Sequence, residues 1–308
     1  MKNILLLGKS GFIGKSLLFF LKKKNYKIYS PKSEKLNLLS FSSLDKYLNK
    51  IPKIDLIINA AAKIGGLGYM IAEPDRIFIE NSQIIANLIR ATKKHKIKNY
   101  LALGSACSYP DNIKKLMIEK NFWNGRINSR IEPYGMVKKF ELTGLNAIKL
   151  KDEQFNYFYP ILANVYGPGD NFDPSHSHVL GSLIKKFIDA KKNQQKKVTI
   201  WGSGTAIRDF IYIDDVSKSI CKIIENKKLK NEIINVTSGE NITIRQLVFL
   251  VKKITKYNGE IQWDKSKPDG TKFKALSKQK MKYYKLNTST NLQSGIKKTL
   301  NWYKNYKC

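Results

Sequence analysis

The sequence predicts an α/β fold in which a doubly wound parallel sheet carries helices on both faces and a smaller α+β lobe is attached. Three observations lead to this prediction. Short apolar runs with the length of buried strands alternate with longer helical patterns in the first half of the chain. The 308 residues suffice for one large domain and an appended lobe. A turn-rich segment, Tyr166–Pro174, then interrupts the alternation.

The expected elements follow in order along the chain. Strands are expected at short apolar runs bounded by turn residues: Ile4–Gly8, Lys27–Ser30, Leu56–Ala60, Tyr100–Leu103 and Tyr157–Val165. Helices are expected where apolar residues recur at helical spacing: Phe12–Leu21, Asn81–Lys94 and Tyr134–Leu150. The second half is expected to contain helices at Val179–Ala190, Asp214–Glu225, Thr243–Thr255 and Ser294–Tyr303, and strands at Val198–Trp201 and Glu232–Val236. Thr243 is the expected N-cap of its helix.

We expect two domains that exchange segments of the chain. Residues 1–164 and about 208–238 are expected to form the Rossmann-type, NADP-binding domain with the parallel sheet. Residues at about 165–207 and 239–308 are expected to form the smaller α+β lobe, which would bind the substrate. The carboxyl ends of the strands would then meet the small lobe in one crevice, where ligands of such sheets bind.

The composition excludes several classes of protein. The three cysteines, Cys107, Cys221 and Cys308, are too few for a disulfide framework, and no Cys/His cluster has metal-ligand spacing, so no metal is expected. The net charge of +32 comes mainly from lysines spread along the chain, which favours acidic ligands but no specific nucleic acid. No apolar run approaches the roughly 18 residues of a membrane span, so we expect a cytoplasmic protein that binds no membrane.

The first expected strand runs into three glycines, Gly8, Gly11 and Gly14. In a strand–turn–helix context the first glycine permits a tight turn, the second lets the backbone approach a pyrophosphate, and the third lets the helix pack closely on the sheet. The spacing therefore predicts a Rossmann-type dinucleotide site. Its expected cofactor-binding residues are Gly8, Lys9, Ser10, Gly11, Phe12, Ile13 and Gly14.

The segment after the second strand indicates which dinucleotide is bound. Sites for NAD usually place an acidic residue there, on the ribose 2′-hydroxyl, but this chain has Ser30–Ser33 without an acid. Lys9, Lys32 or Lys35 is available to meet a 2′-phosphate. The pattern favours NADPH/NADP+ as the cofactor, although these lysines are also typical of an ordinary basic surface.

A second pattern predicts hydride chemistry. Tyr134 and Lys138 lie four residues apart, on one face of the expected helix. The charge of the lysine, together with the positive charge of the oxidised nicotinamide, is expected to lower the pKa of the phenol. The phenol would exchange a proton with a carbonyl oxygen, while Ser105 would hold that oxygen. A lone Tyr-x-x-x-Lys is usually structural, but behind a dinucleotide loop it favours catalysis.

Cys107 and His178 are further candidates. Cys107 follows Ser105 by two residues, so both side chains would face one side if the extended backbone continues. A lone cysteine is more often a buried apolar residue, and His176 competes with His178. A thiol and an imidazole together can move protons at carbons beside a ketone.

These motifs resemble the extended short-chain dehydrogenase/reductases and, among them, the GDP-L-fucose synthase family. The resemblance covers essentially the whole chain. The matching segments are residues 8–14, 36–39, 61–66, 103–110, 132–134, 164–172, 175–179, 201–210 and 266–270.

The resemblance implies an NADPH-dependent conversion of GDP-4-keto-6-deoxy-D-mannose to GDP-L-fucose, in which Ser105, Tyr134 and Lys138 reduce C4. It implies that Cys107 and His178 epimerise C3 and C5. It adds cofactor contacts from Lys32, Ala61, Leu103, Gly104, Lys138, Leu162, Asn164, Val165 and His178. It places the GDP-sugar on Lys186, Trp201, Arg208 and Asp269. It also implies a homodimer through helices at about 77–95 and 134–150.

Two alternatives remain open at this stage. The chain can instead be a related GDP-sugar 4-reductase or 3,5-epimerase that acts on a different keto hexose or heptose. A nucleic-acid-binding or scaffold protein on a reused fold is the other alternative, based on the charge of +32.

Overall fold

The computed structural model describes residues 2–173, 176–267 and 269–307. Within them, seven strands form one sheet in the order β10-β6-β4-β3-β1-β2, with β5 beside β6. Every pair in this sheet is parallel, so the predicted doubly wound class is confirmed. The strands are β1 (Asn3–Leu7), β2 (Lys27–Tyr29), β3 (Leu56–Asn59), β4 (Asn99–Ala102), β5 (Gly104–Ser105), β6 (Asn156–Leu162) and β10 (Glu232–Val236).

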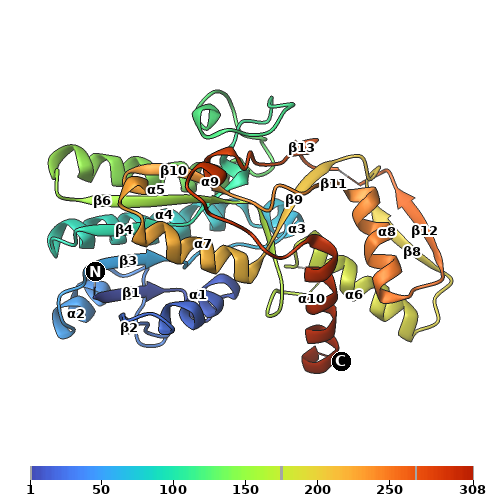
Figure 1. Cartoon of the computed structure of the whole chain (residues 1–308), viewed down its shortest axis with the longest axis horizontal. Helices are drawn as coiled ribbons and strands as arrows, with labels where there is room; N and C mark the ends of the chain where they lie inside the picture. Colours follow the sequence, from blue (N-terminus) through green and yellow to red (C-terminus); the bar gives the residue numbers. More distant parts are fainter. Residues whose placement is uncertain (1, 174–175, 268, 308) are drawn as a thin grey trace.

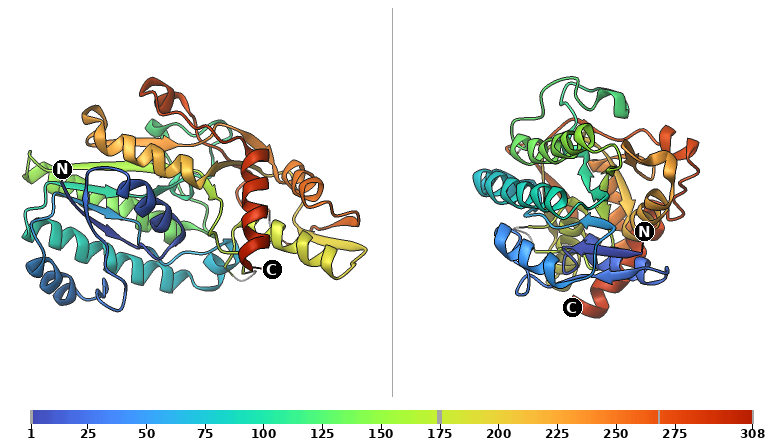
Figure 2. Two further views of the ribbon diagram at one scale, coloured as in Figure 1. Left: turned by 60° about the horizontal axis from the view of Figure 1, so that its bottom comes forward. Right: turned by 90° about the vertical axis from the view of Figure 1, so that its left-hand side faces the viewer.

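Helices cover both faces of this sheet because its strands are apolar on both sides. On one face α1 (Phe12–Lys22) packs against α7 (Ile213–Glu225), and on the other α4 (Pro74–Lys94) lies between α2 (Phe41–Lys50) and α5 (Glu132–Lys151) (Figures 1 and 2). The direction of strand addition reverses between β1 and β3. The loops after these two strands therefore diverge and leave a crevice at their carboxyl ends.

A smaller lobe lies beyond the carboxyl ends of the large sheet (Figure 1). In the described chain, four strands form its main sheet: β7 (Asn164–Tyr166), β9 (Ile207–Tyr212), β11 (Asn241–Thr243) and β13 (Phe273–Lys274). A separate strand pair joins β8 (Lys197–Trp201) to β12 (Glu260–Asp264). The lobe has its own apolar cluster, built mainly on α6 (Val179–Lys192), α8 (Ile244–Thr255) and α10 (Leu292–Lys307). The remaining short helices are α3 (Leu67–Ala72), α9 (Gln279–Tyr283), η1 (Ala106–Ser108), η2 (Glu119–Asn121) and η3 (Lys227–Leu229).

The chain passes between the two lobes at a point where the sequence predicts one continuous strand, Tyr157–Val165. That prediction is wrong at Ala163, whose amide donates to the Val236 carbonyl of the large sheet (3.0 Å), because the next residue, Asn164, already pairs with Phe210 in the small sheet. The later strand β9 also belongs to the small sheet, whereas α7 and β10 return to the large one. We propose the two-domain division on this basis, with β9 counted in the small lobe.

Helix ends follow their local chemistry. Helix α4 begins at Pro74, seven residues before the predicted start at Asn81, because proline fits the first helical turn, where its missing N–H is not needed. Thr243 caps α8 as predicted: its hydroxyl accepts from the Gln246 amide (3.1 Å), and the Gln246 side chain accepts from the Thr243 amide (3.0 Å). No helix in the described part of the chain has the length and apolarity needed to cross a membrane.

Candidate active site

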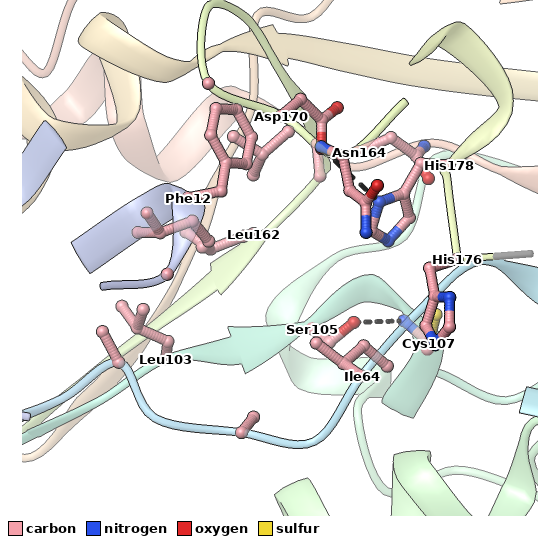
Figure 3. Close-up of a pocket in the computed structure, with 18 of the residues that line it drawn as sticks. Phe12, Ile64, Leu103, Ser105, Cys107, Leu162, Asn164, Asp170, His176 and His178 are labelled. Atoms are coloured by element: carbon pink, nitrogen blue, oxygen red, sulfur yellow. Dashed lines mark hydrogen bonds and ion pairs between the residues drawn. The ribbon is translucent and has the colours of Figure 1, made fainter. Parts of the chain in front are cut away.

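A cavity of about 840 Å³ lies at the carboxyl ends of the large sheet, where the two lobes meet. All five side chains predicted to be catalytic line it, namely Ser105, Cys107, Tyr134, Lys138 and His178. They come from β5, η1, α5 and the residue before α6. The predicted cofactor contacts that also line it are Gly11, Phe12, Ile13, Ala61, Leu103, Gly104, Leu162, Asn164 and Val165 (Figure 3).

The glycine turn closes one end of this cavity. Gly8 has φ +79°, and a Cβ there would collide with the Ala60 backbone, so only glycine fits between β1 and the chain leaving β3. A Cβ on Gly14 would collide with the Gly8 carbonyl oxygen. Gly11 differs, because its Cβ would meet only that oxygen, at 3.3 Å. Helix α1 then starts at Phe12 with its amino end at the cavity, an arrangement that fits a dinucleotide pyrophosphate.

Other predicted cofactor residues lie outside the cavity wall. Gly8, Lys9 and Ser10 belong to the turn itself and Gly14 to the first turn of α1, and none of the four lines the cavity. Lys32 is exposed in the loop after β2. Because Leu5 of β1 is paired with Tyr29 of β2, this loop leaves the sheet beside the glycine turn.

Tyr134 and Lys138 occupy the first two turns of α5. The Lys138 Nζ lies 5.8 Å from the centre of the Tyr134 ring. Burial raises the pKa of Tyr134 and outweighs the charge of Lys138, which acts to lower it. The lysine charge therefore acts in the expected direction but does not offset burial by itself, so a lowered pKa of Tyr134 would depend on the added charge of an oxidised nicotinamide. A phenol with a raised pKa is fully protonated near pH 7, as a proton donor must be.

Ser105 and Cys107 line the same wall, but not by the predicted extended geometry. The backbone turns into η1 after Ser105, and the Ser105 Oγ accepts a hydrogen bond from the Cys107 amide (3.2 Å). The Cys107 thiol lies 3.5 Å from Lys274 Nζ, which donates to it from β13. The contact brings a thiol from η1 and an ammonium from β13 together at the wall of the cavity.

His178 lies in the upper part of the view in Figure 3, beside Asn164 and Asp170, whereas His176 lies beside Cys107. The Nδ1 of His178 is 4.0 Å from the buried Asp170 carboxylate. Burial raises the pKa of Asp170 to about 7. The surrounding cavity walls and the charge of Lys274 lower the pKa of His178 to about 4, although 46 % of its side chain remains accessible. Both histidines line the cavity, so the choice between them stays open on geometry.

Two residues that line the cavity, Lys274 and Asp170, were not predicted as site residues from the sequence. Asp170 lies in the turn-rich segment that the sequence singles out, so its position was a usable signal. Lys274 carried no signal, because it is one of many lysines and reaches Cys107 only through the pairing of β13 with β9. Across the described residues, no group of three or more His, Cys, Asp or Glu side chains is placed to hold a metal ion.

The four residues predicted to bind the substrate lie in the small lobe and do not line the cavity. Lys186 donates to the Thr199 carbonyl (3.1 Å) and lies 6.0 Å from the exposed Trp201 ring. Asp269 accepts from the Ser203 amide (2.7 Å), which ties the loop after β8 to the loop before β13.

Arg208 joins this group to the cavity. Its buried guanidinium donates to the backbone carbonyls of Ile207 (2.8 Å), Thr271 (2.6 Å) and Asp269 (3.3 Å). Burial lowers its pKa, and Cys107 is the first of the charges that oppose this effect. Carbonyl oxygens orient the guanidinium without cancelling its charge, so an anion can still bind beside it.

Comparisons with known proteins place the chain among enzymes with related names and folds. The model of the NAD dependent epimerase/dehydratase family matches residues 4–237. The chain is 34% identical over 305 residues to a GDP-L-colitose synthase of Yersinia pseudotuberculosis, covering 99% of each protein. It is 29% identical over 313 residues to a GDP-L-fucose synthase of Escherichia coli, covering 98% and 96%. A solved GDP-6-OMe-4-keto-L-xylo-heptose reductase from C. jejuni superposes with a TM-score of 0.89 at 24% identity, covering 99% and 98%.

Substituting Gly11 separates cofactor binding from folding. We expect Gly11→Ala to fold near wild-type stability, because its Cβ meets only one oxygen at 3.3 Å. With NADP+ as the probe, we expect it to weaken binding of a nicotinamide dinucleotide by about tenfold or more, because the methyl group would stand where a pyrophosphate would approach the amino end of α1. Titration calorimetry and thermal unfolding measure the two effects. Gly68→Ala is the matched control, since a Cβ there has nothing within 4 Å. Unchanged NADP+ binding by Gly11→Ala would rule out this cofactor site.

Proposed function

This chain belongs to the NAD dependent epimerase/dehydratase family, and we propose that it converts GDP-4-keto-6-deoxy-D-mannose to GDP-L-fucose with NADPH. The resemblance to extended short-chain dehydrogenase/reductases inferred from the sequence is confirmed. One observation carries the proposal: the side chains for reduction (Ser105, Tyr134, Lys138) and those for epimerisation (Cys107, His178) line one cavity with the glycine turn at its end.

In the proposed reduction, NADPH supplies the hydride to C4 of the keto sugar. Tyr134 then donates its proton to the C4 oxygen, so that the ketone becomes an alcohol and the phenol becomes a phenolate. The Ser105 hydroxyl holds the same oxygen, and Lys138 stabilises the phenolate that forms. The raised pKa of Tyr134 supports this direction of transfer, because the phenol enters the step protonated.

In the proposed epimerisations, the Cys107 thiolate removes a proton from the carbon beside the C4 ketone. The electron pair of that C–H bond moves into the carbonyl, and the resulting enolate takes a proton on its other face from His178. The separate positions of the thiol and the imidazole support transfer to opposite faces (Figure 3). Lys274 Nζ lies 3.5 Å from the Cys107 sulfur and is a further polar group on this side of the cavity.

We propose that Lys186, Trp201, Arg208 and Asp269 bind the GDP moiety. The Arg208 guanidinium is oriented by backbone carbonyls and suits the pyrophosphate. The exposed Trp201 ring, at the end of β8, offers a stacking surface for the base.

A second candidate is a related GDP-sugar reductase or epimerase acting on a different keto hexose or heptose. It is favoured by the 34% identity to a GDP-L-colitose synthase, which exceeds the 29% identity to the E. coli GDP-L-fucose synthase. A reductase of this kind would use Ser105, Tyr134 and Lys138 on another sugar, and an epimerase would use Cys107 and His178.

We propose NADPH and not NADH as the reductant. The pairing of β1 with β2 supports Lys9, after β1, and Lys32, after β2, as contacts of a ribose 2′-phosphate. The loop after β2, Ser30–Ser33, has no carboxylate that would repel this phosphate.

We also propose a homodimer formed through α4 and α5. These two helices pack together on one face of the sheet (Figure 2). They leave large apolar side chains exposed: Phe78 and Ile79 on α4, and Met136 and Phe140 on α5. Exposed apolar groups on neighbouring helices are typical of a protein interface.

The first experiment mixes the enzyme with NADPH and GDP-4-keto-6-deoxy-D-mannose in D₂O and reads the product by NMR. We expect NADPH oxidation with deuterium at both C3 and C5. Oxidation without deuterium would leave a simple 4-reductase, deuterium without oxidation would leave an epimerase, and neither would redirect the search to other GDP-sugars.

Cys107→Ala should lower deuterium incorporation by about 100-fold or more while sparing the reduction of an already epimerised ketone. Cys221→Ala is the matched control, because Cys221 is also a buried free cysteine but lies in α7, away from the cavity lining. Full deuterium incorporation by Cys107→Ala would remove the thiol from the mechanism.

Lys32→Ala should raise the KM for NADPH by roughly tenfold and leave the KM for NADH unchanged, because it removes a charge near the 2′-phosphate. Steady-state kinetics with both cofactors measure the difference. Lys53→Ala, an exposed lysine just before β3, is the control. Equal losses with both cofactors would argue against a 2′-phosphate contact.

Phe78→Arg should convert the dimer to a monomer, because it places a charge in the proposed α4–α5 interface. Sedimentation velocity measures the mass. Phe249→Arg on α8 is the control, since Phe249 is 49 % exposed and Phe78 is 46 % exposed. A wild-type protein that sediments as a monomer at micromolar concentration would refute the dimer.

A further inference from the structure

A carboxylate with no assigned role lies behind the Tyr134–Lys138 pair. Glu141 follows Lys138 by three residues on the inner face of α5, and its side chain is completely buried. Its Oε2 lies 3.5 Å from Lys138 Nζ. Buried glutamates are rare unless they are paired, because burial strongly disfavours a carboxylate without a partner.

The other carboxylate oxygen is anchored to the parallel sheet. Oε1 accepts hydrogen bonds from Asn59 Nδ2 (2.7 Å), at the end of β3, and from the Tyr100 hydroxyl (3.0 Å) on β4. Oε2 has no hydrogen-bond partner among the described residues and faces the ammonium alone. Two strands thus fix the position of the carboxylate, and the carboxylate in turn constrains Lys138.

We propose that Glu141 is a positioning residue for reduction, which holds Lys138 charged and in place next to Tyr134. This inference rests on the proposed function, in which Tyr134 and Lys138 carry the reduction. Glu141 acts through Lys138 and does not line the cavity.

The charges of the surrounding buried groups decide which of them neutralises Lys138. Lys138 is 5 % exposed, and burial alone acts to lower its pKa, but Tyr134 and Glu141 together raise it above its usual value. The other groups whose charges act on this trio are Tyr100 from β4, Tyr159 from β6 and Cys107 from η1, and each of them is uncharged or becomes negative. Lys138 is therefore the cation of the cluster and Glu141 its main counter-ion.

Removing the negative charge of Glu141 should lower the pH at which the trio loses its first proton. With Glu141 ionised, Tyr134, Lys138 and Glu141 sum to zero, and loss of a proton leaves a buried net negative charge. With glutamine in its place the trio carries one positive charge, and loss of a proton leaves none. The first proton is therefore lost at lower pH in the variant, whichever of Tyr134 or Lys138 loses it.

The test is the pH dependence of kcat for NADPH oxidation, from about pH 6 to about pH 11, in wild type, Glu141→Gln and Glu141→Asp, because the raised pKa values of Tyr134 and Lys138 place the wild-type decline at high pH. We expect the pH at which kcat declines on the basic side to fall by about one unit or more in Glu141→Gln. Glu141→Asp keeps the charge but withdraws it from Lys138, so we expect a smaller shift in the same direction. Glu225→Gln is the matched control, since Glu225 pairs with Lys24 on the surface (3.1 Å).

The outcomes separate three explanations. A basic limb that stays at the wild-type pH in both variants, even with a lower melting temperature, would make Glu141 merely structural and overturn the inference. An unshifted limb in Glu225→Gln together with a shifted limb in Glu141→Gln would support it. A wild-type enzyme that oxidises no NADPH with any GDP-keto-sugar would refute the proposed function, and that result is distinct from an unshifted limb. If Glu141→Gln does not fold, the shift in Glu141→Asp decides alone.

Discussion

The close approach of two backbone segments at the reversal point of the sheet is the constraint on which the site depends. Gly8 and Gly14 cannot be replaced without a collision, because the chain leaving β3 and the first turn of α1 leave no room for a Cβ. This packing brings the amino end of α1, the carboxyl end of β1 and the residues after β3 to one edge. Every other group in the cavity is arranged around that edge, because the parallel strands all deliver their carboxyl ends there.

Burial sets the electrostatics of the cavity. The pKa of Tyr134 is raised because the cost of burying a phenolate exceeds the benefit of the Lys138 charge. The same cost explains the raised pKa of Asp170 and the lowered pKa of His178. The protein walls therefore favour the uncharged forms of Tyr134, Asp170 and His178.

Most of the large sheet could be predicted from sequence, because buried parallel strands are short apolar runs that need no partner to be recognised. The break at Ala163 could not, because Tyr157–Ala163 is a continuous run of apolar and aromatic residues and only the competing pairs, β10 on one side and β9 on the other, divide the predicted strand. The extended path expected beyond Ser105 failed for a similar reason. A local hydrogen bond from the Cys107 amide to the Ser105 hydroxyl starts η1 instead.

The sequence by itself determined the doubly wound class, the glycine turn and the Tyr134–Lys138 pair, because each of these depends on a pattern of residues that lie close together along the chain. Only the tertiary structure decided which lysine meets Cys107, which carboxylate faces His178 and which glutamate pairs with Lys138. These contacts depend on burial and on strand pairings across long sequence separations. One lysine among many, or one glutamate on a helix, has no distinguishing local pattern until the fold removes it from water.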